Sequence, residues 1–156
     1  MSDAVATNGC PHTIVLAAAG SRAADLTRSL RKFQTKDVHV TKLFAKHIKL
    51  KEAIETVKTS RINIGVGTPQ RMFDLLENGE SQQLEASVWP CTDIYAGALS
   101  AAHLERIVVD ASHIDQKKRG ILDMRETHLP LVQLLTRAGF KERYASTDNR
   151  LVLIFF

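Results

Sequence analysis

Short apolar runs recur along the chain, and amphipathic stretches separate them. Five of the runs are rich in β-branched residues or alternate apolar with polar side chains, as β-strands do. They are TIVLAAA (13–19), DVHVTKLF (37–44), INIGV (62–66), RIVVD (106–110) and RLVLIFF (150–156). The pattern therefore predicts five short strands.

Four stretches between these strands repeat apolar residues every three or four positions, which predicts helices with one buried face. They cover residues 21–33, 49–59, 68–79 and 127–139. Ser21 is placed to cap the first helix, while the third has Thr68 as its cap, Pro69 at its first position and Gly79 at its end. Strands that alternate with helices predict an α/β fold with a mostly parallel five-stranded sheet flanked by helices.

Two stretches fit neither pattern. Residues 1–12 are small and polar, and we expect a flexible leader there, followed by one domain over residues 13–156. Residues 80–102 fit no element, and we expect a surface insertion. A chain of 156 residues can bury about 70% of its unfolded surface, so its core needs no disulfide or metal.

The charges of the chain are segregated along the sequence. Residues 22–71 contain twelve Lys or Arg against four acidic residues, a net charge of +8, whereas residues 72–105 contain six acidic residues and no Lys or Arg. Such segregation indicates a face that meets an anion, and nucleic acid is one candidate. An ordinary solvated surface explains the charge pattern about equally well.

The heptapeptide GVGTPQR (65–71) combines a strand end, a turn and a helix start. Thr68 and the free amides of the first helical turn point toward one spot, and a helix N-terminus attracts phosphate. Arg71 can add a charge-assisted hydrogen bond. Without further information, a plainly capped helix explains the same residues.

Three stretches resemble motifs of DEAD-box RNA helicases in order and spacing. VGTPQR (66–71) is similar to the VGTPGR motif that grips the RNA backbone, and VLAAAGSRAADL (15–26) is similar to the strand and turn carrying PTREL, with Arg22 on its Arg. IVVDASH (107–113) is similar to LVLDEAD, with Asp110 on the first Asp. The resemblance implies a RecA-like domain with RNA contacts at Arg22, Thr68 and Arg71.

A narrower resemblance covers nearly all of residues 13–156. KLFAKHIKLKEA (42–53), GVGTPQR and DQKKRGILDM (115–124) together resemble the Cms family of early small-subunit pre-ribosome factors. The resemblance implies a ribosome-biogenesis protein of the nucleolus, in the nucleus, whose partners are pre-ribosomal RNA and pre-ribosome proteins. That family usually carries a charged N-terminal region, so we expect this chain to be a C-terminal fragment.

The sequence predicts that the domain is not an enzyme. None of its eight glycines is followed by Lys, so it has no P-loop to hold a triphosphate. Ala111 stands where helicases have their catalytic Glu, and a methyl group cannot orient water. We therefore expect Asp110 to make a structural hydrogen bond, and we expect no cofactor, metal, membrane or small-molecule substrate. An ATPase completed by other chains is an improbable alternative.

Several basic residues outside the helicase-like motifs are further candidates for RNA contact. Lys46 and Lys49 belong to the basic stretch, and Lys117, Lys118 and Arg119 form a run that can contact RNA or a protein partner. A solvated turn is the simpler explanation of that run. A protein-only scaffold that has lost RNA binding is the main alternative function.

Overall fold

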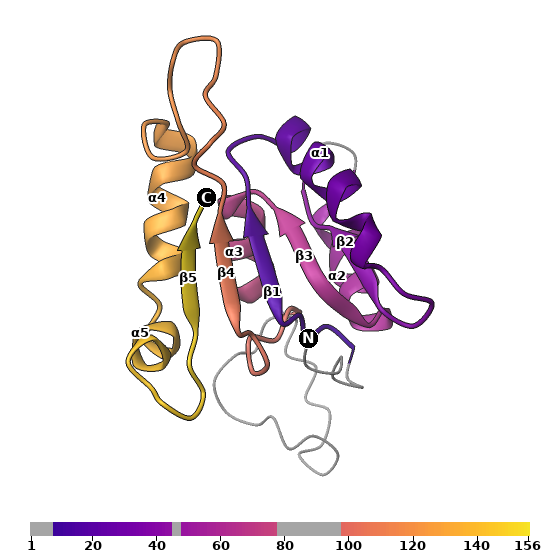
Figure 1. The fold of residues 1–156 in the computed structure, drawn as a ribbon. Coiled ribbons are helices and arrows are strands. Elements are labelled where there is room, and N and C mark those ends of the chain that lie inside the picture. The colour runs from indigo at the N-terminus through magenta and orange to yellow at the C-terminus, as the bar shows by residue number, and fades with distance from the viewer. Residues whose placement is uncertain (1–7, 45–47, 78–97) are drawn as a thin grey trace.

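The computed structural model describes residues 8–44, 48–77 and 98–156, and it contains a five-stranded sheet in the order β2-β3-β1-β4-β5. Every pair of neighbouring strands is parallel (Figure 1). The strands are β1 (Thr13–Leu16), β2 (His39–Lys42), β3 (Ile62–Gly67), β4 (Arg106–Val109) and β5 (Val152–Phe155). The predicted α/β class and the five predicted strands are confirmed.

Helices cover both faces of this sheet. They are α1 (Gly20–Leu30), α2 (Leu50–Thr59), α3 (Pro69–Glu77), α4 (Arg125–Leu135) and α5 (Ala138–Tyr144), with a short 3-10 helix η1 (Arg31–Phe33) after α1. Figure 1 shows α1 in front of the sheet, with α2 and α3 behind it. The chain therefore forms three layers around a parallel sheet, as a sheet buried on both faces requires.

The strand β1 divides the core into two clusters. Ile14 and Leu16 pack with residues of the helices α2 to α5, whereas Val15 packs with Ala23 of α1 on the opposite face. Successive side chains of a strand point to opposite faces, so this division follows from the strand geometry. All four residues of β1 are buried, which explains the continuous apolar run in the sequence.

Two glycines let the end of β3 lie close to the residue that follows β2. A Cβ atom on Gly67 would lie 2.7 Å from the carbonyl oxygen of Leu43 and 3.1 Å from Cε of Met72. A Cβ atom on Gly65 would lie 3.0 Å from Cδ1 of Leu43. A side chain at Gly67 would meet backbone and force the two segments apart, whereas one at Gly65 would require only the Leu43 side chain to move. Gly67 therefore has a packing role besides any contact made by the turn.

Two helix boundaries differ from the prediction. The helix α1 begins at Gly20 with Ala19 at its cap position, so the expected cap at Ser21 is wrong, because Ser21 already lies inside the helix. The helix α4 ends at Leu135, and a separate helix, α5, follows from Ala138 to Tyr144. The sequence analysis did not predict α5, although its Phe140 is completely buried.

The predicted leader and insertion lie partly outside the described residues. Residues 9–11 of the leader are buried, and the amide of Gly9 donates to the carbonyl of Ser60 at 3.1 Å, so the packed domain begins before Thr13. Leu99 and Ala101, at the end of the predicted insertion, are fully buried. Both residues belong to the core cluster, and the amide of Leu99 donates to the carbonyl of Leu75 in α3 at 3.2 Å.

Two further properties concern only the described part of the chain. None of its helices has the length and apolar character needed to cross a membrane. Its His, Cys, Asp and Glu side chains form no group of three that could hold a metal ion.

Candidate nucleic-acid interface

Three of the residues singled out in the sequence, Arg22, Thr68 and Asp110, lie where the strands of the sheet end. Because all five strands are parallel, their carboxyl ends share an edge, which is the upper edge in Figure 1. Arg22 lies in the helix that follows β1, Thr68 follows β3, and Asp110 follows β4. Backbone hydrogen bonds from Ala17 to Gly67 (2.9 Å) and from Asp110 to Leu16 (2.8 Å) hold these three strand ends side by side.

Arg22 and Asp110 form an ion pair across this edge. Nε of Arg22 donates to Oδ2 of Asp110 at 2.6 Å, and Nη2 of Arg22 lies 3.5 Å from Oδ1 of Asp110. Ser112 donates its hydroxyl to Oδ1 at 2.6 Å and its amide to the same atom at 3.2 Å. Asp110 is 1% exposed, so its charge is compensated by these groups rather than by water.

The surroundings of Asp110 keep its carboxyl group ionised. Burial by itself raises the pKa of Asp110, but the hydrogen bonds from Arg22 and Ser112 and the Arg22 charge together hold that pKa below its ordinary value. The hydrogen bond to Asp110 likewise raises the pKa of Arg22. Both groups therefore remain charged at neutral pH.

The structural hydrogen bond that the sequence predicted at Asp110 is present. In a nucleotide hydrolase this carboxylate would help to hold magnesium. Here both of its oxygens accept hydrogen bonds from Arg22 and Ser112. The next residue, Ala111, is half-buried, and its amide donates to the carbonyl of Phe156 at 2.8 Å. The end of β4 is therefore joined to α1 by Asp110 and to the end of β5 by Ala111.

Arg71 does not lie on the open surface. It is 9% exposed, and its Nη2 donates to the carbonyl oxygen of Ile48 at 3.0 Å, which joins α3 to the segment that precedes α2. Its Nη1 is buried without a hydrogen-bond partner in the described ranges. A buried guanidinium nitrogen without a partner is costly, and this one keeps an unused donor inside the fold.

Thr68 and Gln70, which flank Pro69 at the start of α3, are more accessible than Arg71. Thr68 is half-buried, and its carbonyl oxygen accepts the first hydrogen bond of α3 from Met72 at 3.1 Å. The next amides of this turn point along the helix axis, away from α3. Gln70 is exposed, and its Nε2 donates to Oδ1 of Asp74 at 2.8 Å, so the Gln70 side chain is held along the helix.

The lysines of the candidate set are placed differently from the arginines. Lys49 is exposed directly before α2, and its amide donates to Glu52 at 3.3 Å. Lys46 lies outside the described residues. The start of α2 follows the carboxyl end of β2, so Lys49 lies at the same edge of the sheet as Thr68.

The basic run after β4 forms a turn that Asp115 organises. The carboxylate of Asp115 accepts the amides of Lys117 (2.7 Å) and Arg119 (2.8 Å) and forms an ion pair with the Arg119 guanidinium at 2.8 Å. Lys118 adopts a positive φ of 58°. Arg119 is thus engaged within the turn, while Lys117 and Lys118 are exposed.

The sequence analysis missed the pairing of Arg22 with Asp110 and the role of Ser112. A signal for the pair was available, because neighbouring parallel strands place their carboxyl ends together and the two residues carry opposite charges. The contact between Arg71 and Ile48 had no comparable signal, since it depends on how the segment between β2 and α2 folds back.

Comparisons of the sequence with known proteins find one matching family and several similar proteins. A family model described as CMS1, U3-containing 90S pre-ribosomal complex subunit, matches residues 1–87 and 91–156. Protein CMS1 of Chaetomium thermophilum is 51% identical over 156 residues, which are 100% of this chain and 55% of that protein. Protein CMSS1 of Homo sapiens is 30% identical over 122 residues, 78% of this chain and 37% of that protein. The chain spans about half the length of these relatives, or less.

Solved structures of DEAD-box proteins share the fold at low sequence identity. The chain is similar to S. cerevisiae dbp5 l327v bound to nup159, gle1 h337r, ip6 and adp, with a TM-score of 0.54, 14% identity, and coverage of 95% of this chain and 30% of that chain. A DEAD box protein from the hyperthermophile Methanococcus jannaschii gives a TM-score of 0.50 and 14% identity over 96% of this chain and 32% of that chain. These similarities confirm the expected RecA-like fold.

Proposed function

The chain belongs to the CMS1 family of U3-containing 90S pre-ribosomal complex subunits, and we propose that it is a non-catalytic docking domain of the early small-subunit pre-ribosome. The observation that carries this proposal is the arrangement at Asp110. The carboxylate that a helicase would use for magnesium is bound to Arg22 and Ser112 instead. We propose that it acts in the nucleolus, because its family is described as a subunit of the U3-containing 90S pre-ribosomal complex.

An ATPase completed by other chains is not supported by this arrangement. The sequence contains no P-loop, and Ala111 cannot orient water. We expect no measurable ATP hydrolysis by the purified chain and no ATP binding in the micromolar range. Isothermal titration with ATP and magnesium measures the binding, and a phosphate-release assay measures turnover. Micromolar binding, or turnover that is lost in Asp110→Ala, would contradict the proposal.

We further propose that RNA backbone contacts form at the carboxyl edge of the sheet, around the N-terminus of α3. Thr68 and the first amides of α3 lie there, and Arg71 in the first turn of α3 has a buried Nη1 without a hydrogen-bond partner among the described residues. Lys49 adds an exposed positive charge at this edge. Such contacts to phosphates are largely independent of RNA sequence and weaken as the salt concentration rises.

The test uses a lysine rather than an arginine, because Arg22 and Arg71 both make contacts within the fold. Lys49→Gln should weaken binding to short single-stranded RNAs of different sequence by a similar factor, and should lower the salt slope by about one unit. Fluorescence anisotropy across a salt series measures both quantities.

The matched control is Lys58→Gln, which removes another exposed charge, from the last turn of α2, the helix that Lys49 precedes. We expect the Lys58 variant to bind like the parent within about twofold. If the two variants lose RNA affinity equally, binding depends on net charge alone. The proposal that RNA contacts form at this edge would then be wrong.

A protein-only scaffold is the second candidate, and one observation favours it. Both arginines that match the helicase RNA motifs are engaged within the protein, Arg22 with Asp110 and Arg71 with Ile48. If the parent chain shows no salt-sensitive RNA binding at all, this second function replaces the first. The basic residues would then serve the fold and contacts to acidic protein partners.

A further inference from the structure

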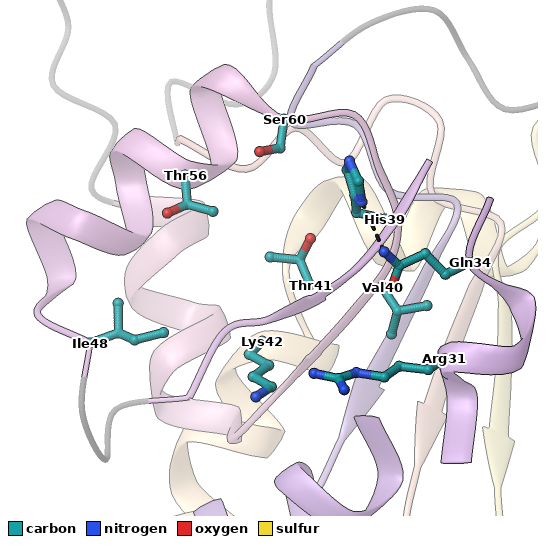
Figure 2. A pocket seen from close by; sticks show the side chains of 9 residues that line it. All are labelled: Arg31, Gln34, His39, Val40, Thr41, Lys42, Ile48, Thr56 and Ser60. Carbon is teal, nitrogen blue, oxygen red and sulfur yellow. Dashed lines mark hydrogen bonds between the residues drawn. The ribbon is translucent and has the colours of Figure 1, made fainter. Parts of the chain in front are cut away.

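The strand β2 lies at one edge of the sheet, and an open groove runs along its outer side. The groove has a volume of about 600 Å³ and is lined by Arg31, Gln34, His39, Val40, Thr41, Lys42, Ile48, Thr56 and Ser60 (Figure 2). Its lining includes none of the residues to which RNA contacts are assigned above, although Ile48 lies next to Lys49 in the chain. Its volume falls within the range of about 300–1,000 Å³ that is usual for ligand sites.

The walls of this groove come from both helical layers. Arg31 and Gln34 stand at the end of α1 and η1, whereas Thr56 and Ser60 belong to the end of α2 on the other face of the sheet. Figure 2 shows β2 between these two walls. The sheet thus ends short of the helices that flank it. One more strand, at the usual spacing of about 4.8 Å, would lie in this gap.

The backbone of β2 has free hydrogen-bonding capacity toward the groove. The amide of Leu43 donates to Val66 of β3 at 2.7 Å, and in a parallel pair alternate residues bond to the same neighbour. Val40 and Lys42 therefore direct their amides and carbonyls away from β3, into the groove. No strand of the described residues pairs with this side of β2.

A hydroxyl group also faces the groove. Thr41 lines the groove, and Figure 2 shows its side chain on the same side of β2 as Thr56 and Ser60. Its hydroxyl oxygen does not belong to the buried side-chain atoms that lack a partner among the described residues, so water or a ligand in the groove can reach it. The groove therefore offers polar side chains as well as the free backbone groups of β2.

Charge defines the ligand further. Arg31 and Lys42 extend toward each other at one end of the groove (Figure 2), and none of the nine lining residues is acidic. We propose that this groove binds an extended acidic polypeptide segment of a partner protein, which pairs with β2 as a sixth strand and places carboxylates at Arg31 and Lys42. An open strand edge matches a polypeptide backbone, which nucleic acid lacks.

The probe is a fluorescent twelve-residue peptide of alternating Glu and Val, added to the intact chain. Anisotropy should show binding, and hydrogen exchange should slow at the amides of Val40 and Lys42, because they donate to the added strand. A matched Glu-Val peptide in which every backbone amide is N-methylated keeps the charge but loses all of its amide donors, and should bind at least about fivefold more weakly.

The double variant Arg31→Gln/Lys42→Gln should weaken binding of the Glu-Val peptide by about fivefold or more. The control Lys117→Gln/Lys118→Gln removes two exposed charges elsewhere and should leave the affinity within about twofold. The proposal is overturned by the absence of binding, by equal affinity for the N-methylated peptide, or by unprotected amides at Val40 and Lys42. It is also overturned if an oligouridylate protects those amides instead. The hydrogen-exchange experiment uses the parent chain, so it tests the proposed strand pairing even if a variant fails to fold.

Discussion

Asp110→Ala is expected to lower the free energy of unfolding by about 2–3 kcal/mol, because it leaves the Arg22 guanidinium without its partner. Removing one member of a fully buried pair costs about 3–5 kcal/mol. The expected value is smaller here because the Arg22 side chain is 28% exposed and can turn toward water. The variant also removes the acceptor of both hydrogen bonds from Ser112.

The effect of Asp110→Ala should depend on pH in a defined direction. The hydrogen bonds and charge of Arg22 and Ser112 lower the pKa of Asp110 in the folded state despite its burial. A carboxyl group with a lowered pKa contributes stability above its unfolded pKa, about 3.9, and this contribution is lost as the pH falls through the folded value. The difference in stability between parent and variant should therefore be constant near neutral pH and should shrink below about pH 4.

Urea denaturation followed by circular dichroism, at several pH values, measures this difference. Asp25→Ala is the matched control, since Asp25 also pairs with an arginine, Arg28, but both side chains are more than half exposed. We expect the control to cost less than about 1 kcal/mol, as exposed pairs do. An Asp110 variant as stable as the control would show that the junction at the end of β4 contributes little.

Phe140→Ala is expected to have the larger effect on stability, a loss of about 3–5 kcal/mol. Phe140 is completely buried, and it packs into the core cluster formed by α2, α3, α4 and the sheet. Truncation would leave a cavity where α5 joins this cluster. Because α5 has only seven residues, it depends on such packing rather than on its own helical propensity.

Thermal and urea unfolding of Phe140→Ala and of Phe33→Ala provide the comparison. Phe33 is 41% exposed at the end of η1, so its truncation should cost less than about 1.5 kcal/mol. If the two variants lose similar stability, the packing of α5 against the core is not as described.

The two central strands β1 and β3 could be predicted from the sequence because they are completely buried. Each appears as a mainly apolar run, in which Thr13 and Asn63 are the polar residues. The edge strands β2 and β5 are more exposed, and their β-branched or alternating residues predicted them instead. The helix α5 could not be predicted in the same way. This helix has only about two turns, and only two residues separate it from α4. Its apolar residues therefore resemble the end of the preceding helix. Whether these residues form a separate helix depends on the packing of Phe140 in the core.

The candidate site was predictable in its position but not in its contacts. The parallel order of the strands places Arg22, Thr68 and Asp110 at one edge, and this follows from the βαβ pattern alone. The sequence does not show that Arg22 binds Asp110 or that Arg71 binds the carbonyl of Ile48. Both contacts join segments far apart in the chain, and a resemblance to RNA-binding motifs does not reveal that the arginines are engaged within the fold.

Cross-linking of the tagged chain in purified early small-subunit pre-ribosomes tests the central claim most directly. Ultraviolet irradiation followed by RNA sequencing and mass spectrometry identifies the RNA segment and the protein residues that touch it. The account predicts cross-links to pre-ribosomal RNA in peptides that contain Thr68 or Lys49, at the carboxyl edge of the sheet. A chain that is absent from these particles, or that cross-links to RNA only through residues away from this edge, would contradict the account.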